Sequence, residues 1–312
     1  MKILYLDQNK WIDLARADKD PLAKPNHTLA LTKIVDAVQS GNLLVPLTAS
    51  NIYETQKIND LPRRKVMAKI QAALSNGIVF QCGRFRFRQE LTGFLLEQFG
   101  KSNGEQLDAW FLSDFFLDAF AERRESNKED WFDSAFKLNQ ANSQAALYGY
   151  LFDLPPETRT TAVKRYSESS VELISQIEQR KSLVSGLNAK KHGDVYRAQL
   201  LSDHIDEIIS IANEQGIPWR SIFDIGEVMA RRIISDLPYF SVETDLIVKL
   251  ERSDHTLNEN DLRDMQNMSA VLPHSSFVVI EKGFAALAIR SRLHQKFGVN
   301  IMTDISELNA IL

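Results

Sequence analysis

The stretch MKILYLDQNKWIDLA, residues 1–15, decides how the rest of the chain is interpreted. It opens with a short apolar run, Ile3-Leu4-Tyr5-Leu6, of the kind found in buried strands. Asp7 follows at once, and residues 11–15 then carry apolar side chains at helical spacing. A strand that passes through an acidic residue into a helix predicts the start of an α/β domain.

The same alternation of strand and helix recurs at both ends of the chain. Strands are expected at 43–46 and 77–80, with a polar helix start near Thr48 and a helix rich in Arg and Lys between them. Towards the C-terminus, a helix over 260–272, a strand over 277–280, a helix over 284–297 and a strand over 299–302 are expected. Continuous apolar strands separated by helices predict a parallel sheet that is flanked by helices.

The middle of the chain has a different pattern. Between about 91 and 235, apolar residues recur at helical spacing and no run is typical of a strand. We therefore expect one discontinuous α/β domain, formed by 1–90 and 236–312, and an all-helical insertion over 91–235.

Composition narrows the class of protein. The net charge of -4 gives no overall basic surface, so any contact with nucleic acid has to come from local patches. The single cysteine, Cys82, excludes an intramolecular disulfide and a cysteine zinc cluster. We expect a cytoplasmic protein, because the first apolar run is too short for a signal peptide and no stretch of about 18 apolar residues is present.

Acidic residues lie where the strands of the predicted sheet end. Asp7 and Glu281 directly follow strands, and Glu54 lies in the first turns of the helix after the second strand. Asp261 and Asp264 are three residues apart and share a helix face. Open parallel sheets bind ligands outside the carboxyl ends of their strands, so these carboxylates are candidates for one site.

A cluster of carboxylates needs a cation, because like charges a few ångströms apart repel. Their hard oxygen atoms suit Mg²⁺ or Mn²⁺, which can activate water and stabilise charge on a phosphate. The chemistry indicated is phosphodiester hydrolysis. The alternative for each acid is structural: Asp7 or Asn9 could cap a helix, Asp261 could be an N-cap, and Glu281 could lie in a surface turn.

Three segments together resemble PIN-like nuclease domains: Leu4 to Ala15, Val45 to Thr55, and Asn260 to Lys282. The resemblance covers roughly the first 80 and the last 70 residues. It implies a PIN-like fold, a divalent metal and RNA as the usual substrate, with DNA as the alternative. The residues that it implies as metal ligands are Asp7, Glu54, Asp264 and Glu281, with Asp261 as the alternative to Asp264.

Basic residues gather in two places that could bind phosphates. Eight lie between Lys57 and Arg88, against one acid, and four more lie between Lys282 and Lys296, with no acid among them. The residues 84–88 alternate Arg and Phe, so a strand there would present three guanidinium groups on one face, with Phe available to stack on bases. The alternative is a solvated basic face over core Phe side chains. The expected nucleic-acid contacts are Arg63, Arg64, Lys65, Arg84, Arg86, Arg88, Lys282 and Arg290.

The sequence therefore leads to the hypothesis of a metal-dependent endoribonuclease. The helical insertion would select the substrate or hold a protein partner or inhibitor, and by analogy such an enzyme would be a regulated effector of the toxin or antiviral-defence type. Two alternatives remain open. One is a catalytically inactive PIN-like scaffold that binds RNA or protein, and the other is an α/β interaction protein with no nucleic-acid role.

Overall fold

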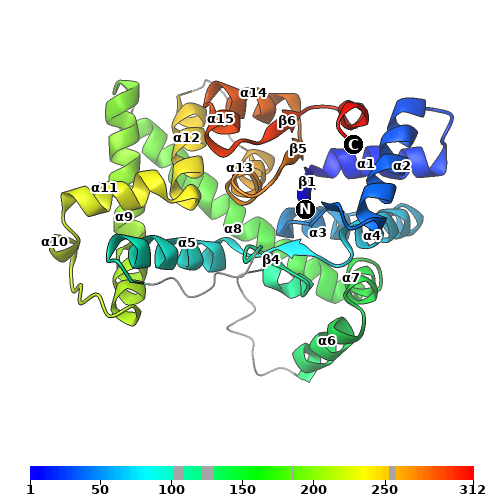
Figure 1. Cartoon of the computed structure of the whole chain (residues 1–312), viewed down its shortest axis with the longest axis horizontal. Coiled ribbons are helices and arrows are strands. Elements are labelled where there is room, and N and C mark those ends of the chain that lie inside the picture. The colour runs from blue at the N-terminus through cyan, green and yellow to red at the C-terminus, as the bar shows by residue number, and fades with distance from the viewer. Residues whose placement is uncertain (102–108, 121–129, 185, 253–257) are drawn as a thin grey trace. The chain divides into compact units, whose positions relative to one another are not determined.

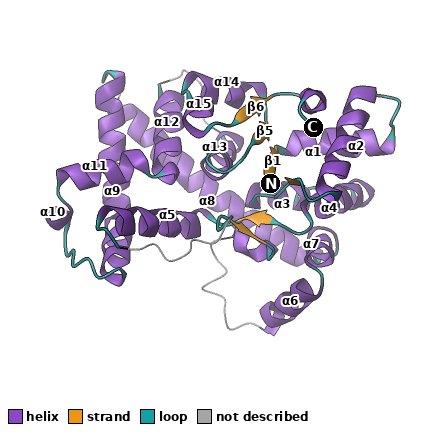
Figure 2. Ribbon diagram, viewed as in Figure 1, coloured by secondary structure: helices purple, strands orange, loops and turns teal. Residues whose placement is uncertain are grey.

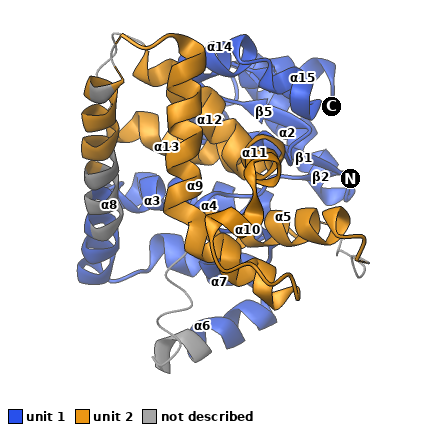
Figure 3. Cartoon of the chain, turned by 90° about the vertical axis from the view of Figure 1, so that its left-hand side faces the viewer, with its two compact units in different colours: residues 1–82, 111–169, 271–312 blue, residues 83–110, 170–270 orange. Residues whose placement is uncertain are grey.

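The computed structural model describes residues 1–101, 109–120, 130–184, 186–252 and 258–312, and its helices and strands are drawn in Figures 1 and 2. The chain forms two compact units, coloured separately in Figure 3. Unit 1 contains residues 1–82, 111–169 and 271–312. Unit 2 contains residues 83–110 and 170–270.

Unit 1 is built on a four-stranded parallel sheet with the strand order β2-β1-β5-β6. The strands are β1 (Lys2–Leu6), β2 (Leu43–Leu44), β5 (Phe277–Val279) and β6 (Asn300–Met302). The two inner strands come from opposite ends of the chain, since Leu6 lies opposite Val279 and Val279 lies opposite Met302. The predicted α/β class and parallel sheet are confirmed.

The continuous apolar run in β1 is explained by its position inside the sheet. Leu4 and Leu6 point to one face and Ile3 and Tyr5 to the other, and all four side chains are buried. Because both faces of the strand are covered, the strand shows no alternation of polar and apolar residues. Leu4 and Leu6 join a core that also contains Trp11, which is fully buried in α1.

Helices surround this sheet within unit 1. Helix α1 packs against α2 and α4, α2 packs against η3, and α4 packs against α7. The helices of unit 1 are α1 (Gln8–Lys19), α2 (Pro25–Gln39), α3 (Ala49–Gln56), α4 (Leu61–Ser75), η1 (Phe116–Ala119), α6 (Asp130–Ala141), α7 (Ser143–Phe152), the first part of α8 (Pro156–Leu183), α14 (Lys282–Arg290), α15 (Leu293–Phe297) and η3 (Ile305–Ala310).

Two expected elements of unit 1 differ from the prediction. The run at 77–80 does form a strand, β3 (Val79–Phe80), which pairs antiparallel with β4 (Leu112–Ser113). Val79 meets Leu47, which follows β2, in a single parallel bridge, so β3 does not join the four-stranded sheet by a full ladder. The helix expected over 284–297 is two helices, because Arg292 has a left-handed φ of 57° that ends one helix and begins the next.

In the described residues of unit 2, every regular element is a helix. The helices are α5 (Gly83–Gln98), the second part of α8, α9 (Ala189–Glu214), α10 (Ile222–Ile225), α11 (Glu227–Asp236), α12 (Pro238–Glu251) and α13 (Glu259–Val271). The compact units divide the chain at other points than the predicted boundaries of 90 and 235. Strand β4 also lies inside the stretch 91–235, so the expectation that this stretch is all-helical is wrong.

Residues 84–88 do not form the strand that would have presented three guanidinium groups on one face. These residues form the first turns of α5, in which Phe87, Leu91 and Leu95 are buried at intervals of four residues. The helical period of this apolar face decides the structure, although the Arg-Phe alternation has the period of a strand. Along a helix each step of two residues turns through about 200°, so Arg84 and Arg88 share one face and Arg86 lies on the opposite one.

Among the residues that the structure describes, no helix is both long enough and apolar enough to cross a bilayer.

Candidate metal site at the carboxyl edge of the sheet

The residues that follow strands β1, β5 and β6 lie side by side, and we call this region the carboxyl edge. The Asp7 backbone N–H donates to the Val279 carbonyl at 3.0 Å, and the Ile280 N–H donates to the Met302 carbonyl at 3.0 Å. The register of the sheet therefore carries on past the strand ends. Asp7 lies beside the Ile280 position, and Glu281 follows one residue later.

Asp7 is the N-cap of α1, and its carboxylate accepts a hydrogen bond from the Gln8 N–H at 2.8 Å. The pKa of Asp7 is raised from 3.8 to about 6, mainly because the carboxyl group is buried, and the negative charge of Glu281 adds to the rise. The Gln8 hydrogen bond and the positive charge of Lys10 oppose the rise. The interpretation of Asp7 as a helix cap is therefore confirmed. A solvated cap would keep an ordinary pKa, however, whereas this carboxyl group resists ionisation.

Glu281 is exposed and stands at the N-cap position of α14. Its carboxylate accepts a hydrogen bond from the Asn9 side-chain amide, which comes from the first turn of α1. The bond joins two helices that begin at neighbouring strand ends. Asn9 thereby holds the second carboxylate close to Asp7, and the structure brings these two predicted ligands together.

Lys10 and Asp304 lie along the same edge. The Lys10 ammonium donates to the Thr303 carbonyl at 2.7 Å. Asp304 caps η3 by accepting from the Ser306 N–H at 2.8 Å, and His27 lies 3.3 Å from its carboxylate. Burial raises the pKa of Asp304, but the Ser306 hydrogen bonds and the charges of His27 and Lys10 outweigh it, so the pKa is lowered. Asp304 thus has the electrostatic character of a satisfied structural acid, unlike Asp7.

Glu54 lies half-buried on α3, in the same unit as Asp7. Helix α3 begins with a capping box in which Thr48 and Asn51 bond each other. The Asn51 side-chain amide also donates to the Leu6 carbonyl at 3.4 Å, which ties this helix to the end of β1. Glu54 is three residues after Asn51, so helix geometry places it near the side of α3 that meets β1.

Asp261 and Asp264 lie on α13, in unit 2. Asp261 completes a capping arrangement, since its carboxylate accepts from the Asn258 N–H at 2.9 Å while the Asn258 side chain accepts from the Asp261 N–H at 3.3 Å. The capping interpretation of Asp261 therefore has direct support. Asp264 is half-buried and lies one turn further along the helix.

Within the described part of the chain, no group of three or more His, Cys, Asp or Glu side chains is placed to hold a metal ion. Asp7 and Glu281 form a pair of carboxylates that are near enough for the charge of Glu281 to raise the pKa of Asp7. Mg²⁺ is commonly held by one or two carboxylates and keeps several waters, so two carboxylates are a sufficient donor set for a weakly bound Mg²⁺. Burial and, to a smaller extent, the charge of Glu281 raise the pKa of Asp7, and a bound cation would favour its ionised form.

The predicted nucleic-acid contacts are of three kinds: buried arginines, arginines paired with glutamates, and exposed basic residues. Arg86 is 3% exposed and donates to the Ser269 carbonyl at 2.9 Å, and Arg64 is 7% exposed and donates to the Ile58 carbonyl at 2.9 Å. Burial, with the charge of Arg159 adding to it, also lowers the pKa of Arg64. In unit 2, Arg84 pairs with Glu207 and Arg88 pairs with Glu214. The predicted contacts that are exposed in unit 1 are Arg63, Lys65, Lys282 and Arg290.

Sequence reasoning missed one feature next to this edge, a buried hydrogen-bonded ring of Gln8, Thr55 and Gln71. A signal was present in α4. Gln71 is four residues after Met67 and three before Leu74, so it occupies an apolar-face position with a polar side chain. A polar residue at such a position needs a buried partner.

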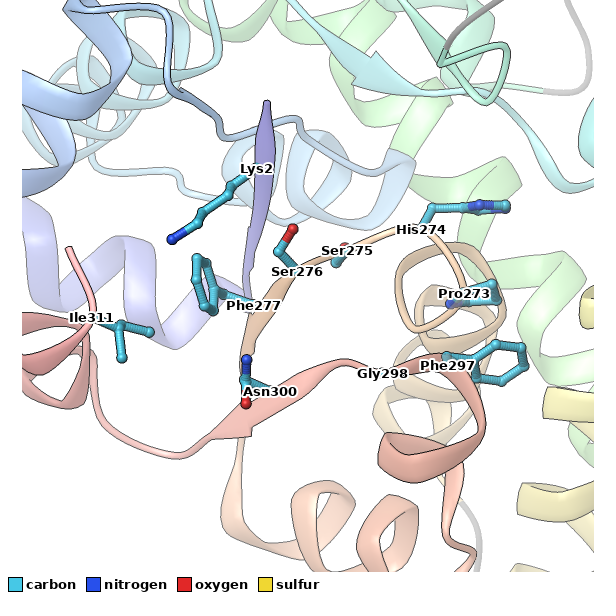
Figure 4. Close-up of a pocket in the computed structure, with 10 residues that line it drawn as sticks. All are labelled: Lys2, Pro273, His274, Ser275, Ser276, Phe277, Phe297, Gly298, Asn300 and Ile311. Carbon is cyan, nitrogen blue, oxygen red and sulfur yellow. The ribbon is translucent and has the colours of Figure 1, made fainter. Parts of the chain in front are cut away.

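Two hollows in the described part of unit 1 lie at the opposite end of the sheet, where the strands begin. One has a volume of about 580 Å³ and is lined by residues that include Lys2, Ser276 and Asn300 at the starts of β1, β5 and β6 (Figure 4). A second, of about 720 Å³, also includes Lys2 in its wall. The Lys2 ammonium lies 5.1 Å from the centre of the Phe277 ring. The candidate ligands Asp7 and Glu281 are not among the residues that line either of these two hollows.

Comparison with known proteins gives no relative. No family model, no curated protein and no solved structure matches this chain.

Proposed function

We propose that this chain is a divalent-metal-dependent nuclease with a PIN-like domain, and that it hydrolyses RNA as an endoribonuclease. The observation that carries the proposal is the pairing of Asp7 and Glu281 at the carboxyl edge of a parallel sheet, with Asn9 bonded to the second acid. Ligand sites in open α/β sheets form at this edge.

Asp7 and Glu281 would hold Mg²⁺ or Mn²⁺, with Glu54 on α3 of the same unit as the further predicted ligand. When bound, such an ion lowers the pKa of water and stabilises negative charge on a phosphate. The residues of the chain have three tasks around it. The two carboxylates neutralise the ion, Asn9 orients Glu281, and Lys10 supplies a positive charge near Asp7.

RNA would reach this edge through basic residues on the same unit. Lys282 and Arg290 stand at the two ends of α14, which starts next to Glu281, and both are exposed. Arg63 and Lys65 on α4 are exposed as well. Exposed cations of this kind bind phosphates without regard to sequence and make affinity depend on salt.

The helical unit 2 would select the substrate or bind an inhibitor. By analogy, we propose that the enzyme acts as a toxin or an antiviral-defence effector. A second candidate function is a PIN-like scaffold that binds RNA or protein without cutting it. The observation in its favour is that the described residues contain no group of three acidic side chains at one point.

One experiment separates the two. A fluorescent single-stranded RNA is incubated with the purified protein in Mn²⁺, in Mg²⁺ and in EDTA, beside the Asp7→Asn variant. The nuclease proposal predicts cleavage by the wild type with metal and none with EDTA or with the variant. RNA that is bound but stays intact under all conditions would support the scaffold, and equal cleavage in EDTA would exclude the metal-dependent mechanism.

A further inference from the structure

Helices α1, α3 and α4 belong to unit 1 (Figure 1), and one polar side chain from each joins a closed hydrogen-bonded ring. Gln8 is 5% exposed, and Thr55 and Gln71 are fully buried. The Gln8 amide donates to the Thr55 hydroxyl at 3.0 Å, this hydroxyl donates to the Gln71 carbonyl oxygen at 2.7 Å, and the Gln71 amide donates to the Gln8 carbonyl oxygen at 3.2 Å. Each side chain therefore donates one bond and accepts one.

A ring of this kind fixes geometry more strictly than apolar packing does. Apolar side chains can slide by a fraction of an ångström at little cost, whereas hydrogen bonds weaken steeply with distance and angle. Three bonds that run in the same direction also polarise one another. The ring thus sets both the rotation and the height of three helices relative to one another.

Two of the three ring members adjoin residues of the proposed metal site. Gln8 is the first residue of α1, and its backbone N–H donates to the Asp7 carboxylate at 2.8 Å. Thr55 directly follows Glu54 on α3. One turn earlier, Asn51 bonds the Leu6 carbonyl, so α3 is tied to the β1–α1 junction at two points on one face.

We infer that Thr55 and Gln71 are positioning residues that fix the placement of Asp7 and Glu54 at the carboxyl edge, an inference that rests on the proposed function. Gln71 lies on α4, and none of the predicted metal ligands is next to it in the sequence. Its effect on the site passes through Gln8 on one side and Thr55 on the other.

The test is direct Mn²⁺ binding to the full chain without RNA, measured by the electron paramagnetic resonance signal of the free ion. Thr55→Val keeps the shape of the side chain but breaks the ring, and Thr55→Ser keeps the hydroxyl. Gln71→Met breaks the ring at a second residue with a side chain of similar size. Ile34→Val, in the core of unit 1 on α2, is the matched control for a small loss of stability.

Thr55→Val and Gln71→Met are expected to weaken Mn²⁺ binding at least tenfold, and the double variant no more than either single variant, because the ring acts as a unit. Thr55→Ser and Ile34→Val should stay within twofold of wild type. If Thr55→Val and Gln71→Met melt at lower temperature yet bind Mn²⁺ as wild type does, the ring only stabilises the fold and the inference is overturned.

Asp7→Asn, measured in parallel, separates this inference from the proposed function. If Asp7→Asn loses Mn²⁺ binding while Thr55→Val keeps it, the metal site stands and the positioning role falls. If Asp7→Asn binds Mn²⁺ as tightly as wild type, Asp7 is not a ligand, and the proposed function and the positioning role both fall.

Discussion

Replacing Asp7 with Asn tests whether this acid does more than cap a helix. Asn has nearly the same shape and is as good an N-cap as Asp, so the variant keeps the cap and loses only the charge. In the folded protein, burial and the nearby Glu281 raise the pKa of Asp7 from 3.8 to about 6. Ionisation of Asp7 above this pH therefore destabilises the folded state.

The magnitude follows from the pKa values. At about 1.4 kcal/mol for each pKa unit, a rise from 3.8 to about 6 corresponds to about 3 kcal/mol of lost stability once Asp7 is ionised. The folded protein holds its proton more tightly than the unfolded chain, so this loss is absent below 3.8, grows as the pH rises through the two values, and is complete above about 6.

Urea unfolding at pH 4 and pH 8 in EDTA measures this difference. Asp7→Asn is expected to unfold at nearly the same urea concentration as wild type at pH 4, and to be more stable by up to about 3 kcal/mol at pH 8. Addition of Mg²⁺ at pH 8 should stabilise the wild type and leave the variant unchanged. A stability difference that does not depend on pH would refute the account of Asp7 as a strained, buried acid.

Three further predictions concern the neighbours of Asp7. Glu281→Gln removes a negative charge, so the pKa of Asp7 measured by NMR should fall from about 6. It should stay above 3.8, because burial contributes more to the raised pKa than Glu281 does. An unchanged pKa would show that the two groups are not coupled. Lys282→Ala combined with Arg290→Ala should weaken RNA binding and reduce its dependence on salt concentration, without a change in melting temperature. If RNA affinity depends on salt as steeply as in wild type, RNA does not contact α14. Asp304→Asn should leave RNA cleavage intact and lower the stability of the fold at pH 7. The loss of stability should shrink as the pH falls, because the pKa of Asp304 is lowered in the folded state. Loss of cleavage would place this acid in the site.

The sheet could be predicted because its strands are buried on both faces. Runs such as residues 3–6 and 277–280 contain only apolar side chains, and a short uninterrupted apolar run has few other structures open to it. The placement of Asp7 and Glu281 at one edge follows from the same fact, since the residue after each parallel strand falls at the same end of the sheet.

Two other features could not be predicted, for different reasons. Residues 84–88 alternate like a strand, but the apolar face of Phe87, Leu91 and Leu95 makes them the start of a helix. The ring of Gln8, Thr55 and Gln71 joins residues up to 63 positions apart. Hydrogen bonds between such distant residues leave only a weak trace in one sequence, namely a polar residue on an apolar helix face.

The most direct test of the central claim is a crystal of the full chain soaked in Mn²⁺, with the ion located by its anomalous scattering. The account predicts a peak at the carboxyl edge, coordinated by the Asp7 and Glu281 carboxylates, that is missing in crystals of Asp7→Asn. Strong Mn²⁺ peaks elsewhere, with none between these two side chains in protein that cleaves RNA, would contradict it.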